Sequence, residues 1–338
     1  MSLEKSNRLF VITNNTHFQI ILNYIENHPV RNNYIILTIT PFEGYKIFLE
    51  EVIGSKLKLL GSFINNQVDK FPVNYYKLWK NYFGIKKLNL SHYCFEQVIF
   101  SNYDSLLQHI VLAETKIIKP VLISDGVAIF KILDLRTTTS EARLNSHSFF
   151  IKKVFKIKPF KQIHFFSPVD LPPPKNDTIE IFAYNKNINF EIVENLIYFV
   201  DSPLVERDFV NIEKKIQYLH CLKNKFPDKK FIYFAHRRER DENLIRYKFF
   251  GEIRKDSVPF EERLKIDKYL PKIIISFISS ILINLPINYP NIEFRYLILE
   301  KDDIIDRNFE MLYFNLLNNF KLIKSKNLKL LDLSNKSN

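Results

Sequence analysis

The stretch that decides the fold is FIYFAHRRE, residues 231–239, in which four apolar residues are followed at once by a dense polar cluster. The run Phe231–Phe234 predicts a buried β-strand, and His236–Glu239 predicts a loop at its carboxyl end. In an open α/β sheet the carboxyl ends of parallel strands face the ligand crevice. This junction therefore predicts both a parallel sheet and a functional site.

Two further segments repeat this arrangement. Val121–Ile123 leads into Ser124, Asp125 and Gly126, and Ile273–Ile275 leads through three residues to the pair Ser279–Ser280. A carboxylate, an imidazole with guanidinium groups, and a pair of hydroxyls are thus expected at three strand ends. This set of groups is typical of an enzyme that handles a phosphorylated donor.

The composition sets the outer limits. The chain has 338 residues, is 46% hydrophobic, and holds 49 Lys and Arg against 37 Asp and Glu, for a formal net charge of +12. The length suggests two domains of about 150 residues each. The charge favours anionic partners, namely nucleotides, nucleic acid or an acidic membrane face. The Lys-rich stretches 151–161 and 321–336 fit either solvated surfaces, which we favour, or peripheral contact with the anionic inner face of the cell membrane.

Cysteine usage and the amino-terminal residues predict a cytoplasmic protein. Cys94 and Cys221 are far apart and lack the spacing of a zinc site or a redox pair, so we expect two reduced thiols. Met1–Arg8 is polar, and the apolar stretch after it is interrupted at Asn14 and Asn15, so no signal peptide is predicted.

Short apolar runs alternate with segments of helical periodicity, which predicts βαβ units and mainly parallel sheets. Strands are expected over residues 9–13, 34–40, 97–101, 120–124, 196–200, 230–234, 272–277 and 294–299. Helices are expected over residues 18–27, 45–53, 104–114, 212–225 and 308–320.

A proline-rich stretch over residues 167–178 predicts the crossing between two domains. We expect an acceptor-side α/β domain over residues 1–175, a donor-binding α/β domain over 176–325 and a Lys-rich tail over 326–338. Two Rossmann-like α/β domains that face each other across a cleft, the GT-B type of architecture, are common among nucleotide-sugar transferases, although fold alone does not give function.

Several ligand motifs are missing. The chain has only 6 glycines, and none lies in a G-x-G-x-x-G or P-loop pattern. An Asp-x-Asp motif for a metal-held sugar diphosphate is also missing. We therefore expect no metal and no cofactor, and protein groups are expected to hold the phosphate.

The hydroxyl pair and the histidine suit that task. Ser279 and Ser280 follow a strand and are expected to open a helix, where hydroxyls and free backbone N–H groups bind anions. His236 can stabilise a leaving phosphate and, if protonated, act as its general acid. Two capping serines and a structural histidine are the ordinary alternatives.

The flanking residues complete the predicted site. One of Arg237 and Arg238 is expected to pair with Glu239 or a neighbouring carboxylate, and the other to reach the acidic groups of the donor. Asp125 is the candidate general base, and Gly126 lets the backbone turn or the substrate approach. Asp-Gly is also an ordinary turn dipeptide.

These motifs resemble those of the bacterial sialyltransferases that share Asp-Gly, His-Pro and Ser-Ser motifs. The resemblance is to glycosyltransferase family 52, the lipooligosaccharide sialyltransferase type, with capsule polysialyltransferases as more distant relatives. It extends from about residue 9 to 300 as short motifs separated by unmatched sequence. One departure is Arg237, which stands where the His-Pro motif has proline.

Three further segments support the resemblance. Residues 13–19, with Asn14, Asn15 and Thr16, resemble the acceptor-side loop of the family. Residues 258–261, which end in Glu261, resemble its ribose-side Pro-x-Glu, and residues 201–204 resemble the loop that opens its nucleotide domain.

The resemblance implies an inverting, metal-independent transfer of a nonulosonic acid, usually sialic acid, from a CMP-activated donor to a hydroxyl of a bacterial surface glycan of lipooligosaccharide or capsule type. It implies that Asp125 is the base, His236 the acid and phosphate partner, and Glu261 a ribose ligand. The phosphate of CMP would be bound by Ser279 and Ser280.

Other functions remain open from the residues. One is a transferase with another donor, namely CMP-legionaminate, CMP-pseudaminate, CMP-Kdo or a nucleotide-diphosphate hexose. Another is a basic module that binds RNA or a membrane, suggested by the net charge together with 17 Tyr and 31 Phe. We expect no nucleic-acid partner, because the aromatic residues lie mainly in apolar core patterns. The acceptor sugar, the linkage and the oligomeric state are not encoded in these motifs.

Overall fold

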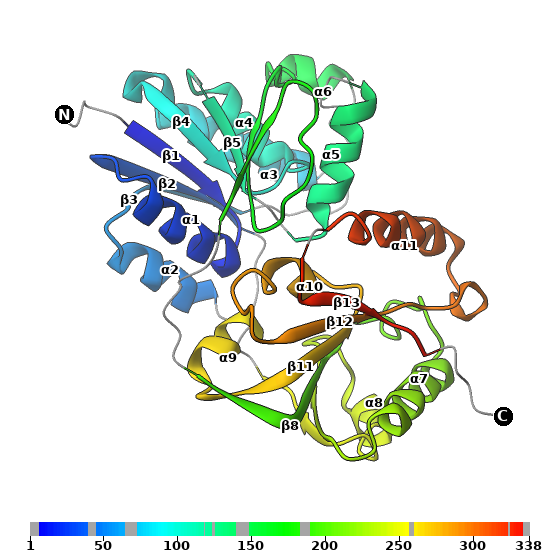
Figure 1. Cartoon of the computed structure of the whole chain (residues 1–338). Coiled ribbons are helices and arrows are strands. Elements are labelled where there is room, and N and C mark those ends of the chain that lie inside the picture. The colour runs from blue at the N-terminus through cyan, green and yellow to red at the C-terminus, as the bar shows by residue number, and fades with distance from the viewer. Residues whose placement is uncertain are drawn as a thin grey trace. The chain divides into compact units, whose positions relative to one another are not determined.

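A computed structural model describes residues 7–39, 45–64, 73–117, 119–123, 126–139, 149–182, 190–256, 260–323 and 325–333 (Figure 1). The chain divides into two compact units. The first comprises Met1–Ser167 and Pro172–Tyr184, and the second comprises Pro168–Leu171 and Asn185–Asn338. The predicted boundary after residue 175 falls inside the segment that returns to the first unit.

The first unit is built on a parallel sheet with the strand order β3-β2-β1-β4-β5-β6-β7, seven strands among the described residues. The strands are β1 (Asn7–Ile12), β2 (Asn32–Ile39), β3 (Lys58–Ile64), β4 (Phe95–Phe100), β5 (Lys119–Ile123), β6 (His164–Ser167) and β7 (Thr178–Ile181). The helices are α1 (Asn15–Asn27), α2 (Tyr45–Gly54), α3 (Val73–Lys87), the 3-10 turn η1 (Leu90–Tyr93), α4 (Leu106–Ala113), α5 (Ala128–Thr139) and α6 (Phe149–Val154).

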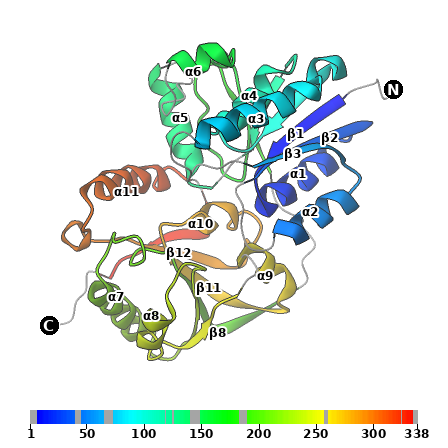
Figure 2. The ribbon, with the colours of Figure 1, turned by 180° about the vertical axis from the view of Figure 1, so that it is seen from behind.

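Helices cover both faces of this sheet. Figures 1 and 2 show α1 and α2 on one face, and α3 and α4 on the other. Strands that are covered on both faces read as continuous apolar runs, which explains Leu9–Ile12 and Ile35–Leu37. Phe18 of α1 and Phe48 of α2 pack together edge to face, 6.0 Å between ring centroids, in the core beneath these helices.

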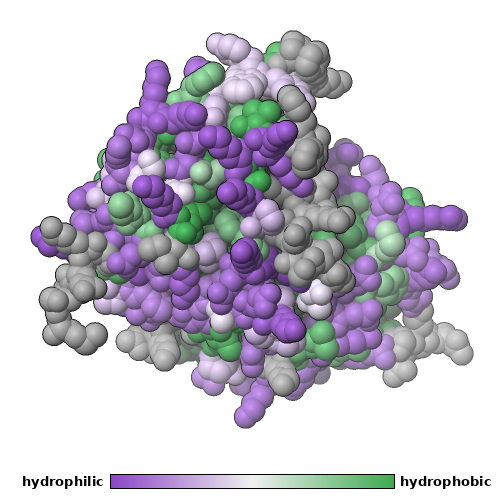
Figure 3. Space-filling view, turned by 90° about the horizontal axis from the view of Figure 1, so that it is seen from above, coloured by the Kyte–Doolittle hydropathy of each residue, from purple (hydrophilic) through white to green (hydrophobic). Residues whose placement is uncertain are grey.

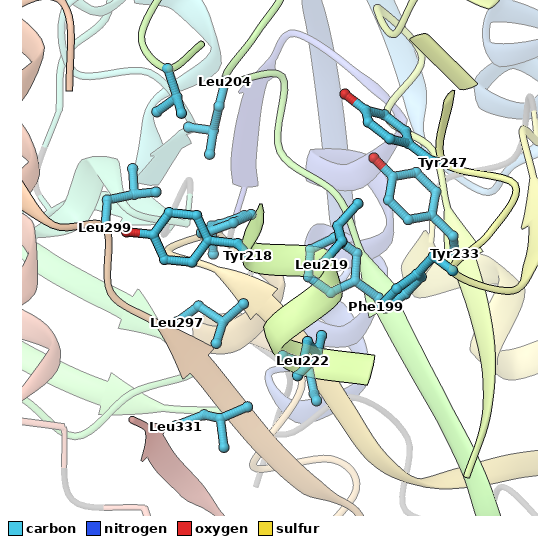
Figure 4. Close-up of a cluster of buried hydrophobic side chains, with 14 of the residues drawn as sticks. Phe199, Leu204, Tyr218, Leu219, Leu222, Tyr233, Tyr247, Leu297, Leu299 and Leu331 are labelled. Atoms are coloured by element: carbon cyan, nitrogen blue, oxygen red, sulfur yellow. The ribbon is translucent and has the colours of Figure 1, made fainter. Parts of the chain in front are cut away.

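The second unit holds a second parallel sheet with the order β10-β9-β8-β11-β12-β13, six strands among the residues described. The strands are β8 (Glu191–Val200), β9 (Lys230–Phe234), β10 (Glu252–Arg254), β11 (Tyr269–Phe277), β12 (Glu293–Leu297) and β13 (Leu328–Leu331). The helices are α7 (Ile212–Lys225), α8 (Asp241–Arg246), α9 (Phe260–Ile266), α10 (Ile281–Asn284), the 3-10 turn η2 (Lys301–Asp303) and α11 (Arg307–Phe320). Its core contains Phe199, Tyr233 and Leu219 (Figure 4).

The expected elements are present with ends shifted by a few residues, and the sequence missed five strands, namely β3, β6, β7, β10 and β13. Strand β3 is half exposed at a sheet edge, so it lacks the continuous apolar run of a central strand. The stretch expected as a Lys-rich tail contains β13, because Leu331 is buried against the second core.

Part of the surface is largely polar. Figure 3 shows one face on which hydrophilic residues predominate and hydrophobic residues are scattered between them. Among the described residues, no helix combines the length and apolar character that crossing a bilayer requires.

Candidate functional site

The carboxyl ends of three neighbouring strands in the second unit lie level with one another. Val200 of β8 pairs in register with Phe234 of β9 on one side and with Ser276 of β11 on the other. Adjacent strands are about 4.8 Å apart, so β9 and β11 are separated by about 10 Å. His236 follows β9 and Ser279 follows β11, and both therefore lie at the same edge of the sheet. One phosphate-bearing ligand can span that separation.

His236 begins a tight turn. The Glu239 N–H donates to the His236 carbonyl at 2.8 Å, which closes a β-turn over residues 236–239. The Arg238 N–H donates to His236 Nδ1 at 3.2 Å. Since Nδ1 accepts, the proton of the neutral ring lies on Nε2. Arg237 occupies the second turn position, where proline is favoured, so arginine leaves the turn of the His-Pro pattern intact.

The imidazole is neutral at pH 7 in the ligand-free protein. Burial and the positive charges of Arg237 and Arg238 together lower the pKa of His236 to about 4, against the smaller opposing effect of Glu239. The ring therefore presents a neutral Nε2–H hydrogen-bond donor. The general-acid role expected from the sequence requires an anion beside the ring, because a neighbouring negative charge favours the imidazolium form.

Glu239 is anchored by a lysine. Its Oε1 accepts from Lys215 Nζ at 2.7 Å and from the Tyr233 hydroxyl at 2.7 Å. One arginine of the loop was expected to pair with Glu239 or a neighbouring carboxylate. The pairing with Glu239 was wrong, because Glu239 points into the core while Arg237 and Arg238 are exposed. Among the described residues neither arginine has an ion pair, so both guanidinium groups are available to an anionic ligand.

Asp201, the first residue after β8, completes a buried cluster. Lys215 Nζ donates to Asp201 Oδ2 at 2.8 Å, and both side chains are fully buried. Burial raises the pKa of Asp201 well above its ordinary value, against the lowering effect of Lys215, and Glu239 raises it further. A proton on Asp201 leaves one carboxylate against one ammonium, which makes the buried group neutral.

Two tyrosines enclose the ammonium group. Lys215 Nζ lies 4.7 Å from the ring centre of Tyr247 and 5.7 Å from that of Tyr233. Figure 4 shows the two rings side by side, and their centroids are 5.4 Å apart. This cluster ties together the loops that follow β8 and β9, and so fixes the backbone from which His236 projects.

The serine pair lies at the end of β11. Both serines are half-buried, and among the described residues neither hydroxyl has a hydrogen-bond partner. Ser280 precedes α10 as expected, but α10 has only four residues, so its dipole adds little. The hydroxyls themselves are the groups that this loop offers to a ligand.

Glu261 lies in the first turn of α9 and contacts α10. Burial raises the pKa of its carboxyl, and a hydrogen bond with the Asn284 side chain partly opposes this shift. Asn284 follows Ser280 by four residues, and its N–H donates to the Ser280 carbonyl at 2.9 Å, so the two lie on one face of a helical turn. Glu261 is therefore close to the serine pair. The preceding residues 257–259 lie outside the described part of the chain.

In the first unit, Ser124 and Asp125 lie outside the described residues. Gly126 has φ of 54°, which confirms the expected role of glycine in turning the backbone. A pocket of about 40 Å³ lies beside this turn at the carboxyl ends of β4 and β5 and includes Asn102, Asp104 and Lys131 in its lining. Its volume is that of one or two water molecules.

The residues expected to form the acceptor-side loop begin helix α1. Asn14 is the N-cap of α1, and its Oδ1 accepts from the His17 N–H at 3.0 Å. Asn15 and Thr16 form the first turn of α1 and are half-buried. The loop is thereby held at the carboxyl end of β1.

Gln108 is a residue that the sequence analysis missed. Its side chain is fully buried, donates to the hydroxyls of Thr13 and Thr38 at 3.0 Å, and accepts from the N–H groups of Ser101 and Asn102. It ties together the carboxyl ends of β1, β2 and β4. The signal was present, since Gln108 and His109 interrupt a helix whose other residues are apolar.

Among the described residues, no group of three or more His, Cys, Asp or Glu side chains is placed to hold a metal ion. The polar groups that lie at this edge of the second sheet are therefore an imidazole N–H, two hydroxyls, two guanidinium groups and a carboxyl.

Comparison with known proteins places the fold. No protein-family model matches the chain, and no curated protein matches it in sequence. A UDP-GlcNAc 2-epimerase from Methanocaldococcus jannaschii is similar in structure, with a TM-score of 0.54, 14% identity, and coverage of 95% of this chain and 94% of that one. LpCGTa in complex with UDP gives a TM-score of 0.53 at 9% identity, covering 96% and 84%.

A UDP-glucosyltransferase from Polygonum tinctorium gives a TM-score of 0.50 at 8% identity, covering 88% of this chain and 81% of that one. At such identities the likeness shows the fold alone. Together with the two parallel sheets it shows that this chain has the GT-B fold, built from two Rossmann-like domains.

Proposed function

We propose that the protein is a glycosyltransferase that uses a nucleotide-activated sugar, and that its donor is a CMP-linked nonulosonic acid, with sialic acid as the first candidate. The observation that carries the proposal is the level placement of the His236 turn and the Ser279–Ser280 pair at one edge of the second sheet. An imidazole N–H and two hydroxyls without partners suit a phosphate.

The choice of a CMP-linked donor rests on charge and on motif resemblance. A CMP-nonulosonate carries one phosphate and one sugar carboxylate. The serine hydroxyls and His236 suit the phosphate, and Arg237 or Arg238, exposed in the same turn, suits the carboxylate. The Asp-Gly, His and Ser-Ser motifs occur in the order found in family 52 sialyltransferases.

The motif resemblance supplies the base for the reaction, Asp125, and the groups described above supply the stabilisation of the leaving phosphate. In this reaction the acceptor hydroxyl attacks the anomeric carbon and gives its proton to that base, while the bond between that carbon and the phosphate oxygen breaks and CMP leaves. Charge develops on the leaving phosphate in an oxocarbenium-like transition state. The Nε2–H of His236 and the serine hydroxyls stabilise it by several kcal/mol, as preorganised donors do. Attack on the face opposite the leaving group inverts the configuration.

The donor and the acceptor are the parts to test first. Thermal unfolding with CMP, UDP, GDP and AMP in the presence of EDTA reports which nucleotide binds the folded protein. We expect stabilisation by CMP alone. CMP release is then measured with CMP-sialate, CMP-legionaminate, CMP-pseudaminate and CMP-Kdo, using bacterial surface glycans as acceptors.

Two variants and a matched control make this assay specific. His236→Ala and Asp125→Ala are expected to fold and to lose transfer, and His220→Ala, an exposed histidine of α7 in the second unit, is expected to retain it. Stabilisation by UDP or GDP would contradict a CMP-linked donor and favour a nucleotide-diphosphate hexose as the donor. Epimerisation of UDP-GlcNAc without transfer would show that the protein is an epimerase and contradict the proposed transferase function.

A further inference from the structure

Helix α3 exposes aromatic side chains along one face. Tyr75 is 44% exposed, Tyr76 is 72%, Trp79 is 39% and Phe83 is 56%. Trp79 follows Tyr75 by four residues and Tyr76 by three, and Phe83 follows Trp79 by four, so these positions fall on one side of a helix. Trp79 is the only tryptophan in the chain. The other side of α3 supplies the core residues Tyr82 and Ile85 of the first unit.

The same helix is strongly basic. It contains Lys77, Lys80, Lys86 and Lys87 and has no Asp or Glu between residues 73 and 87. Lys80, Lys86 and Lys87 are exposed. The face therefore combines large apolar rings with positive charge, which differs from an ordinary solvated helix, where both charge signs are mixed.

A second basic segment packs against α3. Phe155, which follows α6, lies 5.4 Å from Trp79 and 5.0 Å from Tyr82 between ring centroids. Residues 149–161 contain Lys152, Lys153, Lys156, Lys158 and Lys161 and have no acidic residue. We call α3 and residues 149–161 together the basic aromatic surface. Both segments belong to the first unit.

We propose that the basic aromatic surface binds an anionic lipid bilayer. Trp and Tyr favour the level of the lipid headgroups, and a basic helix with an apolar face lies in the plane of the membrane interface. Each lysine near an anionic leaflet favours binding about fivefold. Lys158 and Lys87 are two of the exposed lysines that contribute in this way.

Lipid fits the surface better than nucleic acid does. Neither segment contains arginine, the residue that most often forks onto phosphates and bases. The rings of Tyr76 and Phe83 lie along a helix, whereas base stacking generally uses rings displayed within a groove that follows the strand. Bilayer docking would also bring the enzyme to glycans that are anchored in lipid, although the proposal does not rest on the proposed function.

Trp79 makes a direct test available with the unmodified full chain. Vesicles of phosphatidylcholine alone and of phosphatidylcholine with phosphatidylglycerol are added while tryptophan emission is followed. We expect a blue shift and quenching by brominated lipid only with the anionic vesicles, and loss of both at high salt. Unchanged emission with anionic vesicles would overturn the proposal, because the reporter lies within the surface itself.

Charge reversal separates this surface from general charge. Lys80→Glu with Lys87→Glu is expected to weaken vesicle co-sedimentation by at least about 30-fold, from two lysines lost. The control pair Lys230→Glu with Lys248→Glu makes the same charge change at exposed positions of the second unit and is expected to shift binding by less than threefold. Unfolding temperatures confirm that each variant folds.

Three outcomes would contradict the proposal. Equal loss in the two pairs would mean that net charge alone drives binding. Equal binding to neutral and anionic vesicles would remove the role of the lysines. Short single-stranded RNA that competes with the vesicles, and that binds more tightly than they do, would assign the surface to nucleic acid.

Discussion

Lys215 Nζ lies 2.7 Å from Glu239 Oε1, and both side chains are fully buried. The contact joins helix α7 to the loop that carries His236, and Asp201 completes it from the neighbouring strand end. Two buried carboxyls thus surround one ammonium group directly behind the candidate site. A buried pair of this kind is costly to break, because each remaining charge has no water to solvate it.

Replacing Lys215 with Met is therefore expected to destabilise the second unit by about 3–5 kcal/mol. Lys272 of β11 is the control: its side chain is 42% exposed and pairs at 3.3 Å with Glu194, whose side chain is 72% exposed. Lys272→Met should cost no more than about 1 kcal/mol, as exposed pairs do. Urea unfolding measures both variants. Similar losses in the two would show that the buried cluster has no special role in holding the loop.

The titration of His236 provides a second prediction. Its pKa is lowered to about 4 in the free protein, so the ring is neutral in the folded state at pH values where an unfolded histidine, with a pKa near 6.5, is already charged. The folded state thus binds fewer protons. This contribution to stability is fully present above about pH 6.5 and is lost as the pH falls toward 4.

Proton NMR of the imidazole measures this pKa directly. A bound phosphate favours the charged ring, so saturating CMP should raise the pKa of His236. His220 serves as an internal reference and should not respond to CMP. A free-protein pKa near 6.5, or no change with CMP, would contradict the role of His236 at the phosphate.

Proline substitutions at positions 237 and 238 test the different places of the two arginines in the turn. Position 237 is the second residue of the β-turn, so Arg237→Pro should fold with stability unchanged or raised by up to about 1 kcal/mol. Arg238→Pro removes the N–H that donates to His236 Nδ1 and should destabilise the turn and alter the tautomer of the ring. Arg237→Ala isolates the loss of charge. The readouts are unfolding temperature and CMP affinity, and equal effects of both prolines would exclude this turn geometry.

Gly126 offers a test of the turn after β5. Its φ of 54° is strained for any residue with a Cβ, so Gly126→Ala should cost about 1–2 kcal/mol. Gly54 in α2 is the control, because a Cβ there would meet nothing within 4 Å, and Gly54→Ala should be neutral or stabilising. Thermal unfolding compares them. Equal unfolding temperatures would mean that residue 126 adopts an ordinary backbone conformation in solution.

The sequence predicted the strands that are buried on both faces, because these read as continuous apolar runs, as in Phe231–Phe234. It missed β3, an edge strand in which no residue is fully buried, and β13, whose short apolar segment lies among lysines. The preference of a sequence for a strand depends on whether the strand is central or at an edge, so edge strands are harder to predict from local sequence.

The sequence predicted where the candidate site residues lie in the fold, but it did not predict the contacts that support them. His236, Ser279 and Ser280 follow strand ends, which sequence order reveals. The sequence did not identify Lys215 as the partner of Glu239, because Lys214 and Lys215 are adjacent residues of the same type in one helix. A signal did exist, since Lys215 falls four residues before Leu219 and lies on the buried stripe of α7, whereas Lys214 does not.

The serine pair yields the last prediction. Because both hydroxyls lack partners among the described residues, replacing them leaves no buried polar group unpaired, and Ser279→Ala with Ser280→Ala should fold with wild-type stability. Each hydroxyl that bonds a charged phosphate contributes about 1.5–3 kcal/mol, so the double variant should bind CMP at least about 100-fold more weakly. Ser276→Ala is the control from the same strand: its hydroxyl is buried and donates to the Val200 carbonyl at 2.7 Å, so it should lower stability while leaving CMP affinity nearly unchanged. Isothermal titration with CMP, alongside unfolding, resolves the two effects. An unchanged CMP affinity in the double variant would show that the phosphate does not bind at the end of β11. The His236 turn would then be the remaining candidate for binding the phosphate.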